Sequence, residues 1–113
     1  MRAAVRITFY GDDGEKFFGE GPARLLHALE ETGSLRAGAK RMDMAYSKAL
    51  RILKNAEAAL GFPLTERTAG GRDGGGSRMT KEGREWLARY ESYRDECIKA
   101  CAGIYAQRFE GER

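Results

Sequence analysis

Basic side chains are concentrated in the middle of the sequence, between residues 34 and 54. This segment holds six lysines and arginines against a single acidic residue, Asp43, a local charge of +5, whereas the whole 113-residue chain carries +3. Such a concentration of positive charge is the electrostatic footprint expected of a surface that binds a polyanion such as nucleic acid. A basic face that is merely solvated is the alternative interpretation.

The spacing of polar residues inside this segment indicates how they could read a nucleic acid. Arg51 follows Ser47 by four positions and Lys48 by three, so these side chains share one side of a helix. Tyr46 lies in the same first turn, and Lys54 lies one turn further along. Short polar and longer cationic side chains near the start of a helix can reach base edges in the major groove of duplex DNA. A plain amphipathic helix without a ligand is equally compatible with this spacing.

A second group of candidate contacts surrounds a glycine-rich segment at residues 69–77. Its glycine spacing matches a phosphate-binding P-loop, but Ser77-Arg78 stands where that motif requires Lys-Ser or Lys-Thr. We therefore expect the tip of a β-hairpin, between strands at residues 64–68 and 78–79, that contacts DNA phosphates. The candidate contacts are Arg67, Arg72, Ser77 and Arg78. A hairpin tip that touches no ligand is the alternative.

Apolar residues at helical spacing predict the elements that position the basic segment. A short helix is expected over about residues 35–42, with Ser34 as a favourable N-cap. A second helix is expected over about residues 45–60, with Leu50 and Leu53 on its buried side. Two helices joined by a few residues, the second of them basic, form a helix-turn-helix pattern. At the start of the first helix, Ser34 is a candidate phosphate contact and Arg36 a candidate DNA-binding residue.

Apolar residues near the C-terminus follow a heptad spacing in a long helix expected over about residues 81–107. The seam consists of Trp86, Tyr90, Tyr93, Cys97 and Ile104. An aromatic stripe of this width is expected to need a second copy of the chain to cover it, which predicts a homodimer. The alternative is that the stripe packs wholly on its own domain. Cys97 and Cys101 are interpreted as small apolar residues rather than as a redox or metal site.

The N-terminal residues complete the predicted architecture. Apolar and polar residues alternate in segment 5–10, and a Gly-Asp-Asp-Gly turn separates it from a second short strand at residues 16–18, as in a β-hairpin. A helix is expected to follow over about residues 22–32. The expected fold class is α+β, mainly α. It is a winged helix-turn-helix with a short N-terminal β-hairpin and a long C-terminal dimerisation helix, in one domain spanning residues 1–113.

Other classes of protein are not expected. His27 is the only histidine, and no nucleophile or isolated carboxylate pair accompanies it, so no catalytic site, metal site or cofactor is predicted. No apolar run is long enough for a transmembrane helix, and the N-terminus has no apolar segment typical of a secretion signal. With only two cysteines, these features predict a cytoplasmic protein with no membrane partner, associated with the nucleoid if it binds DNA.

A set of short motifs spans most of the chain and ends in the glycine-rich segment followed by Thr-x-x-Gly. The motifs lie at residues 21–26, 32–35, 37–40, 44–50, 64–67 and 70–77. Together they resemble the N-terminal winged helix-turn-helix domain of the molybdate-responsive (ModE-type) transcriptional regulators, a relative of the LysR-type DNA-binding domain. The resemblance covers about residues 5–105. It implies a regulator that dimerises through its long helices and places the helix at residues 45–60 in the major groove, with the hairpin as a wing.

The sequence departs from that family at three points. Leu50 stands where the family often has tryptophan, and Asp73 interrupts the glycine-rich wing. The chain ends at Arg113 without the family's oxyanion-binding domain, so molybdate sensing is not expected to carry over.

The sequence therefore predicts a sequence-specific transcriptional regulator that binds double-stranded DNA at a palindromic operator as a homodimer. No small-molecule effector site is evident. The second class considered is a winged-helix protein-interaction and dimerisation module that does not contact DNA. The positive charge of residues 34–54, between slightly acidic ends of the chain, favours DNA.

Overall fold

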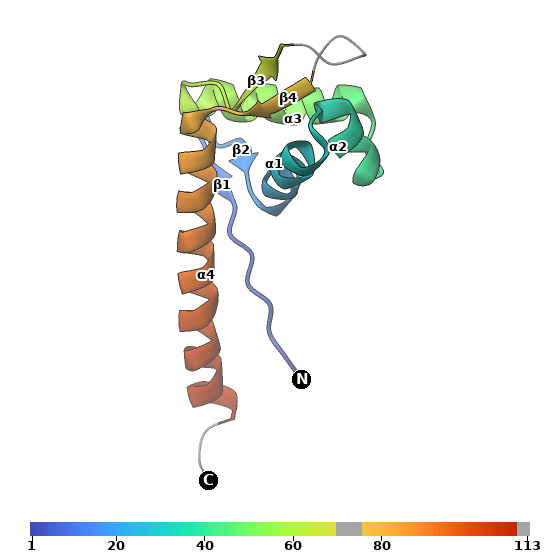
Figure 1. Cartoon of the computed structure of the whole chain (residues 1–113). Coiled ribbons are helices and arrows are strands. Elements are labelled where there is room, and N and C mark those ends of the chain that lie inside the picture. Colours follow the sequence, from blue (N-terminus) through green and yellow to red (C-terminus); the bar gives the residue numbers. More distant parts are fainter. Residues whose placement is uncertain (70–75, 111–113) are drawn as a thin grey trace.

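The computed structural model describes residues 1–69 and 76–110. Its elements are β1 (Phe9–Tyr10), β2 (Lys16–Phe18), α1 (Glu20–Thr32), α2 (Leu35–Arg41), α3 (Tyr46–Leu60), β3 (Thr65–Thr68), β4 (Gly76–Met79) and α4 (Lys81–Phe109). Figure 1 shows α1, α2, α3 and the hairpins gathered at one end of the molecule, while α4 continues far beyond them. The molecule measures 64 × 29 × 24 Å because the 29-residue α4 is longer than the domain from which it projects.

The helix-turn-helix consists of α2, a short turn and α3, packed on α1. Ser34 caps α2 as predicted, and its Oγ accepts a hydrogen bond from the Ala37 N–H at 3.0 Å. Helices α1 and α2 approach closely because Gly38 has no side chain: a Cβ there would lie 2.9 Å from the Leu29 backbone nitrogen. Helix α3 ends at Gly61, whose φ of 85° is a left-handed conformation that glycine adopts readily.

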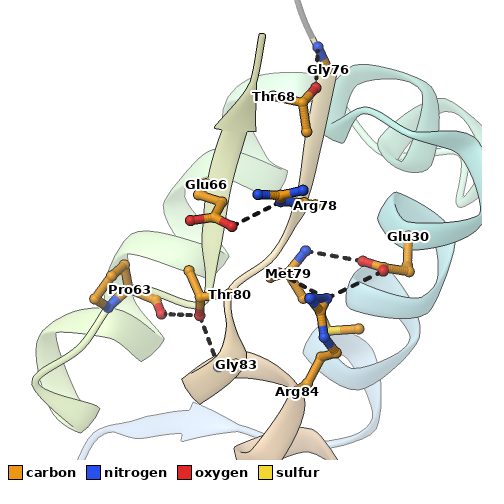
Figure 2. A network of polar contacts seen from close by, with 10 residues as sticks. All are labelled: Glu30, Pro63, Glu66, Thr68, Gly76, Arg78, Met79, Thr80, Gly83 and Arg84. Carbon is orange, nitrogen blue, oxygen red and sulfur yellow. Dashed lines mark hydrogen bonds and ion pairs between the residues drawn. The ribbon is translucent and has the colours of Figure 1, made fainter.

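The wing is the antiparallel pair β3 and β4, in which Thr65 lies opposite Met79. The prediction of a hairpin at this place is confirmed. Its second strand leads directly into α4, where Thr80 is the N-cap. The Thr80 hydroxyl donates to the Pro63 carbonyl oxygen at 2.7 Å and accepts from the Gly83 N–H at 2.8 Å, as Figure 2 shows. These contacts hold the start of α4 against the chain that enters the wing.

The hydrophobic core lies between α1, α3, the base of the wing and the first turns of α4. It is filled mainly by leucine and alanine side chains: Ala23, Leu25, Leu26, Leu29, Leu35, Ala39, Ala49, Leu53, Ala56, Leu64 and Leu87. On α3 the sequence-based expectation was wrong at Leu50, which is 38% exposed. Ala49 takes the buried place instead, because the 49–53–56 spacing follows the buried side of the helix.

An aromatic cluster joins the first turns of α4 to the β1–β2 hairpin. The ring centroids of Trp86 and Tyr90 lie 5.4 and 5.0 Å from that of Phe18, in edge-on arrangements. Phe9 packs edge-on against the same two rings, at 5.4 and 5.9 Å. The expectation that a second copy must cover Trp86 and Tyr90 is therefore wrong. The N-terminal hairpin covers them, and helical spacing within α4 does not reveal so distant a partner.

Residues 1–8 form no strand, contrary to the strand expected over residues 5–10. The reason is that β2 is only three residues long and offers no further partner for pairing. The N-terminal segment instead runs along α4 (Figure 1), towards the end of that helix farthest from the wing. The Tyr90 hydroxyl donates to the Ile7 carbonyl oxygen at 2.9 Å, and the Tyr105 hydroxyl donates to that of Met1 at 3.0 Å.

Candidate nucleic-acid interface

The face of α3 that points away from the core carries Ser47, Arg51 and Lys54. Successive residues of a helix turn by about 100°, which places these three side chains opposite the buried Ala49 and Leu53. All three are exposed. The structure thus brings them together as the spacing predicted, on a polar surface with two cations. Their contact with DNA stays a prediction.

Lys48 lies to one side of this face, beside the N-terminal hairpin. It borders a hollow of about 340 Å³ that is also lined by Lys16 and Phe17 of β2 and by Ile52 of α3. Lys16 therefore lies close to Lys48 and adds a positive charge beside the basic surface, which the sequence did not predict. No local signal could have found it, because β2 and α3 become neighbours only in the folded chain.

Tyr46 and Leu50 lie on the other side of the outward face, towards α2. Arg36 of α2 stacks on the Tyr46 ring, with its Cζ 4.2 Å from the ring centroid. This contact joins the first turns of α2 and α3, so two predicted contact residues support each other. Leu50, one turn after Tyr46, is an exposed apolar group that the sequence analysis assigned to the core. An apolar side chain at such a place is suited to the methyl group of thymine.

The wing residues differ in how free their side chains are. Arg67 is exposed on β3. Arg78 is also exposed, but its Nε donates to Glu66 Oε2 on the neighbouring strand at 2.8 Å, so a phosphate would have to compete with that carboxylate. Ser77 is half-buried, and its backbone N–H donates to the Gly33 carbonyl oxygen at 2.8 Å. Arg72 lies outside the described residues.

Ser34 is half-buried at the start of α2. Its hydroxyl oxygen is engaged in capping the helix through the Ala37 N–H. The Thr32 hydroxyl is 3.1 Å from the Ser34 carbonyl oxygen, which holds the chain between α1 and α2 in place. A phosphate contact by Ser34 would therefore come in addition to a local structural role.

The predicted seam on α4 separates into a covered and an uncovered part. Trp86 and Tyr90 are buried, at 9% and 1% exposure, whereas Tyr93 and Ile104 are each 54% exposed. Cys97 is half-buried. The neighbouring Cys97 side chain raises the pKa of the Tyr93 hydroxyl. Only Tyr93, Cys97 and Ile104 therefore offer seam surface to a second copy.

Two further observations concern the residues that the structure describes. Among them, no group of three or more His, Cys, Asp and Glu side chains is arranged to hold a metal ion. His27 contacts Glu91 instead, with its Nε2 2.7 Å from Oε2, and so links α1 to α4. None of the helices in residues 1–69 and 76–110 is long and apolar enough to cross a membrane.

Comparison with known sequences gives a consistent match over the helix-turn-helix and the wing. Residues 23–84 match the family described as "Bacterial regulatory helix-turn-helix protein, lysR family". "Molybdenum transport protein ModE" of Azotobacter vinelandii is 38% identical over 69 residues, which is 61% of this chain and 26% of that protein. "Transcriptional regulator ModE" of Yersinia pestis is 31% identical over 67 residues, or 59% of this chain and 26% of that protein. The chain thus spans about a quarter of the length of these curated relatives.

Solved structures with a similar fold include DNA-binding domains in complex with DNA. The structure described as "CbnR_DBD-DNA complex" is 23% identical, with a TM-score of 0.59, and the match covers 76% of this chain and 93% of that one. The structure described as "BenM_DBD/benA site 1 DNA Complex" is 25% identical, with a TM-score of 0.53, and the match covers 76% of this chain and 94% of that one. These likenesses confirm the predicted winged helix-turn-helix fold with a long C-terminal helix.

Proposed function

The chain belongs to the lysR family of bacterial regulatory helix-turn-helix proteins, and from this premise we propose that it is a transcriptional regulator that binds double-stranded DNA in a sequence-specific manner. The observation that carries the proposal is the outward face of α3. Its Ser47, Arg51 and Lys54 side chains are exposed and lie opposite the buried side of the helix. The matched family consists of regulatory proteins rather than enzymes, and DNA-complex structures share the fold.

In the proposed complex, α3 enters the major groove. Ser47 and Arg51 on its outward face read base edges, with Tyr46 and Lys48 on either side of them. Arginine suits guanine because its guanidinium donates two parallel hydrogen bonds to O6 and N7. Lys54, two turns after Ser47 on the outward face, and Arg36 of α2 bind phosphates, whose contacts set the register of the protein on the duplex.

The wing is proposed to lie on the DNA backbone beside the recognition helix. Arg67 and Arg78 are both exposed. Arg78 binds a phosphate once that phosphate displaces Glu66. Ser77, Ser34 and Arg72 are the other proposed contacts. The proposal for Arg72 rests on sequence alone.

We further propose a homodimer formed by distal α4, the part of α4 from residue 91 to residue 109. Tyr93 and Ile104 leave an apolar surface in water that is covered when two copies pair, and two-fold pairing is the commonest form of assembly. A two-fold dimer presents two recognition helices to successive turns of DNA, about 34–36 Å apart, and so predicts a palindromic operator. The DNA partner places the proposed site of action at the nucleoid, in the cytoplasm.

Selection of bound sequences from a random DNA pool tests this proposal, with affinity for the selected site then measured against salt. We expect one palindromic motif and a steep loss of affinity, on the order of a thousandfold between about 50 and 200 mM salt if six phosphates are contacted. Enrichment of no motif, or binding that ignores salt, would contradict the proposal. The chain would then be better described as a winged-helix module that binds another protein through distal α4.

A further inference from the structure

The outer edge of the wing is attached to α1. Strand β4 pairs with β3 on one side, and on the other side its backbone donates hydrogen bonds to Glu30 in the last turn of α1 and to Gly33, which follows the helix. The Ser77 N–H donates to the Gly33 carbonyl oxygen at 2.8 Å, and the Met79 N–H donates to Glu30 Oε1 at 3.0 Å. A two-stranded hairpin is only marginally stable alone, and an open edge leaves its donors unpaired. Glu30 and Gly33, at the end of α1, therefore supply the hydrogen-bond acceptors that a third strand would otherwise supply.

Glu30 links more than one element at this edge. Its second oxygen, Oε2, lies 3.5 Å from Arg84 Nη1, and the same Nη1 donates to the Met79 carbonyl oxygen at 2.9 Å. Figure 2 shows the Glu30 carboxylate facing both Met79 and Arg84. These three residues belong to α1, β4 and α4 respectively. One carboxylate thus ties the supporting helix, the wing and the long helix together at the base of the wing.

The strand is held too close to α1 to be free in its orientation. A Cβ added to Gly76 would lie 2.2 Å from the Gly33 carbonyl oxygen, so β4 could not take this position with a larger residue there. The Gly76 N–H donates to Thr68 Oγ1 at 3.1 Å, which joins the same point to β3. The direction of the wing is therefore determined by contacts along the whole of β4, from Gly76 to Met79.

We propose that Glu30 is a positioning residue for DNA binding, which orients the wing against the helix-turn-helix without touching the nucleic acid. The inference rests on the proposed function, since it assumes that Arg67 and the rest of the wing reach the duplex. Removing the carboxylate leaves the Met79 N–H, on a residue that is 6% exposed, without its acceptor. The Ser77–Gly33 hydrogen bond remains, but the Met79 end of β4 is no longer held against α1. The strand can then shift at that end, and Arg67 on the paired strand is held less firmly.

The first test does not use DNA. Amide hydrogen exchange is compared in the wild type, Glu30→Ala and Glu30→Gln, with Glu31→Ala as the matched control. Glu31 is the next residue of α1, carries the same charge and pairs with Arg41 rather than with the wing. We expect faster exchange at Met79 in Glu30→Ala, retained protection in Glu30→Gln because its amide oxygen still accepts a hydrogen bond, and no change in Glu31→Ala. Unchanged exchange at Met79 in Glu30→Ala would overturn the proposal.

The second test measures affinity for the selected DNA site in a double-mutant cycle with Arg67→Ala. Glu30→Ala should weaken binding by roughly threefold to tenfold relative to Glu31→Ala, and Glu30→Gln should restore most of the loss. In the Arg67→Ala background the effect of Glu30→Ala should largely disappear, because the misplaced cation is already absent. Full additivity, or equal binding by the Glu30→Ala and Glu31→Ala proteins, would overturn the positioning role alone. If the wild type binds no DNA, the proposed function falls and this inference with it.

Discussion

The winged core, which comprises the described residues from 18 to 90, and distal α4 use the same kinds of side chain in different ways. Tyr90 and Tyr93 stand three positions apart on one predicted seam, yet Tyr90 is 1% exposed and Tyr93 is 54% exposed. The β1–β2 hairpin covers Tyr90 with both Phe9 and Phe18, whereas Tyr93 meets the hairpin edge-on at Phe9, with ring centroids 5.8 Å apart. Beyond Tyr93 the body of the domain ends (Figure 1). The burial of each turn of α4 therefore depends on which other element of the fold packs against it. The first turns of α4 are part of the folded core, whereas the distal part of the seam is available for dimerisation.

The largest difference between the two regions is expected in folding stability. Tyr90→Ala should lower the free energy of unfolding by about 3–5 kcal/mol, because it removes a fully buried aromatic ring from the core. Tyr93→Ala is the comparison variant and should cost clearly less, because the Tyr93 ring is 54% exposed and packs edge-on against Phe9 alone. Both are measured by urea denaturation at the same protein concentration. Equal losses in the two variants would mean that the two halves of α4 do not differ as the structure indicates.

Dimerisation should depend on distal α4, in contrast to folding stability, which depends on the winged core. The pair Tyr93→Asp and Ile104→Asp places charges on the uncovered seam, so it should give a folded monomer in sedimentation. Affinity for an operator with two half-sites should fall on the order of a hundredfold, because two separate monomers must then bind the half-sites that one dimer binds together. The control pair, Ala88→Asp and Ser92→Asp, adds the same charge at exposed positions away from the seam and should stay dimeric. A dimer that survives the seam substitutions would place the interface elsewhere, with the N-terminal hairpin as the next candidate.

A substitution on the outward face of α3 should affect recognition and leave both folding and assembly intact. Arg51→Ala is expected to cost about 1–3 kcal/mol of binding free energy and to relax the preference at one base position. Lys54→Ala should instead weaken all sequences to a similar extent and reduce the salt dependence. Binding measured across a set of single-base variants of the operator separates the two. A uniform loss for Arg51→Ala would reassign that side chain to the DNA backbone.

The smallest expected effect is the pH dependence of the core. Burial, and next the nearby negative charge of Glu20, raise the pKa of Tyr90 above its ordinary value. The neutral hydroxyl is thus favoured in the folded state. Its contribution to the free energy of unfolding is complete below a pH of about 10 and is lost as the pH rises through the raised pKa. Tyr90→Phe should cost about 1 kcal/mol at neutral pH, through loss of the bond to the Ile7 carbonyl. It should also make urea midpoints less sensitive to pH above 10 than in the wild type. Identical alkaline slopes in the two proteins would argue against a role of the Tyr90 hydroxyl.

Much of the architecture could be predicted because its signals are local. The helix-turn-helix, the wing and the long final helix follow from apolar spacing, from the N-cap Ser34 and from the glycine-rich segment at residues 69–77. The candidate DNA surface was predicted in its centre, at Ser47, Arg51 and Lys54, for the same reason: residues three or four apart share a face of any helix. The prediction was wrong about which face of α3 is buried. The more hydrophobic Leu50 was expected to be buried, but the smaller Ala49 is buried instead.

The sequence by itself determined which segments form the helices and the wing, where several of them begin and end, and where positive charge accumulates, but not the short extent of β1. These properties depend on interactions within a turn or two of the chain. Only the tertiary structure decided that the N-terminal hairpin covers Trp86 and Tyr90, that Lys16 lies near Lys48, and that Glu30 holds the edge of the wing. Glu30 and Met79 are 49 positions apart, and such pairs come together only when the whole set of elements packs. Their contacts depend on the distances and angles between elements, which no periodicity within a single element encodes.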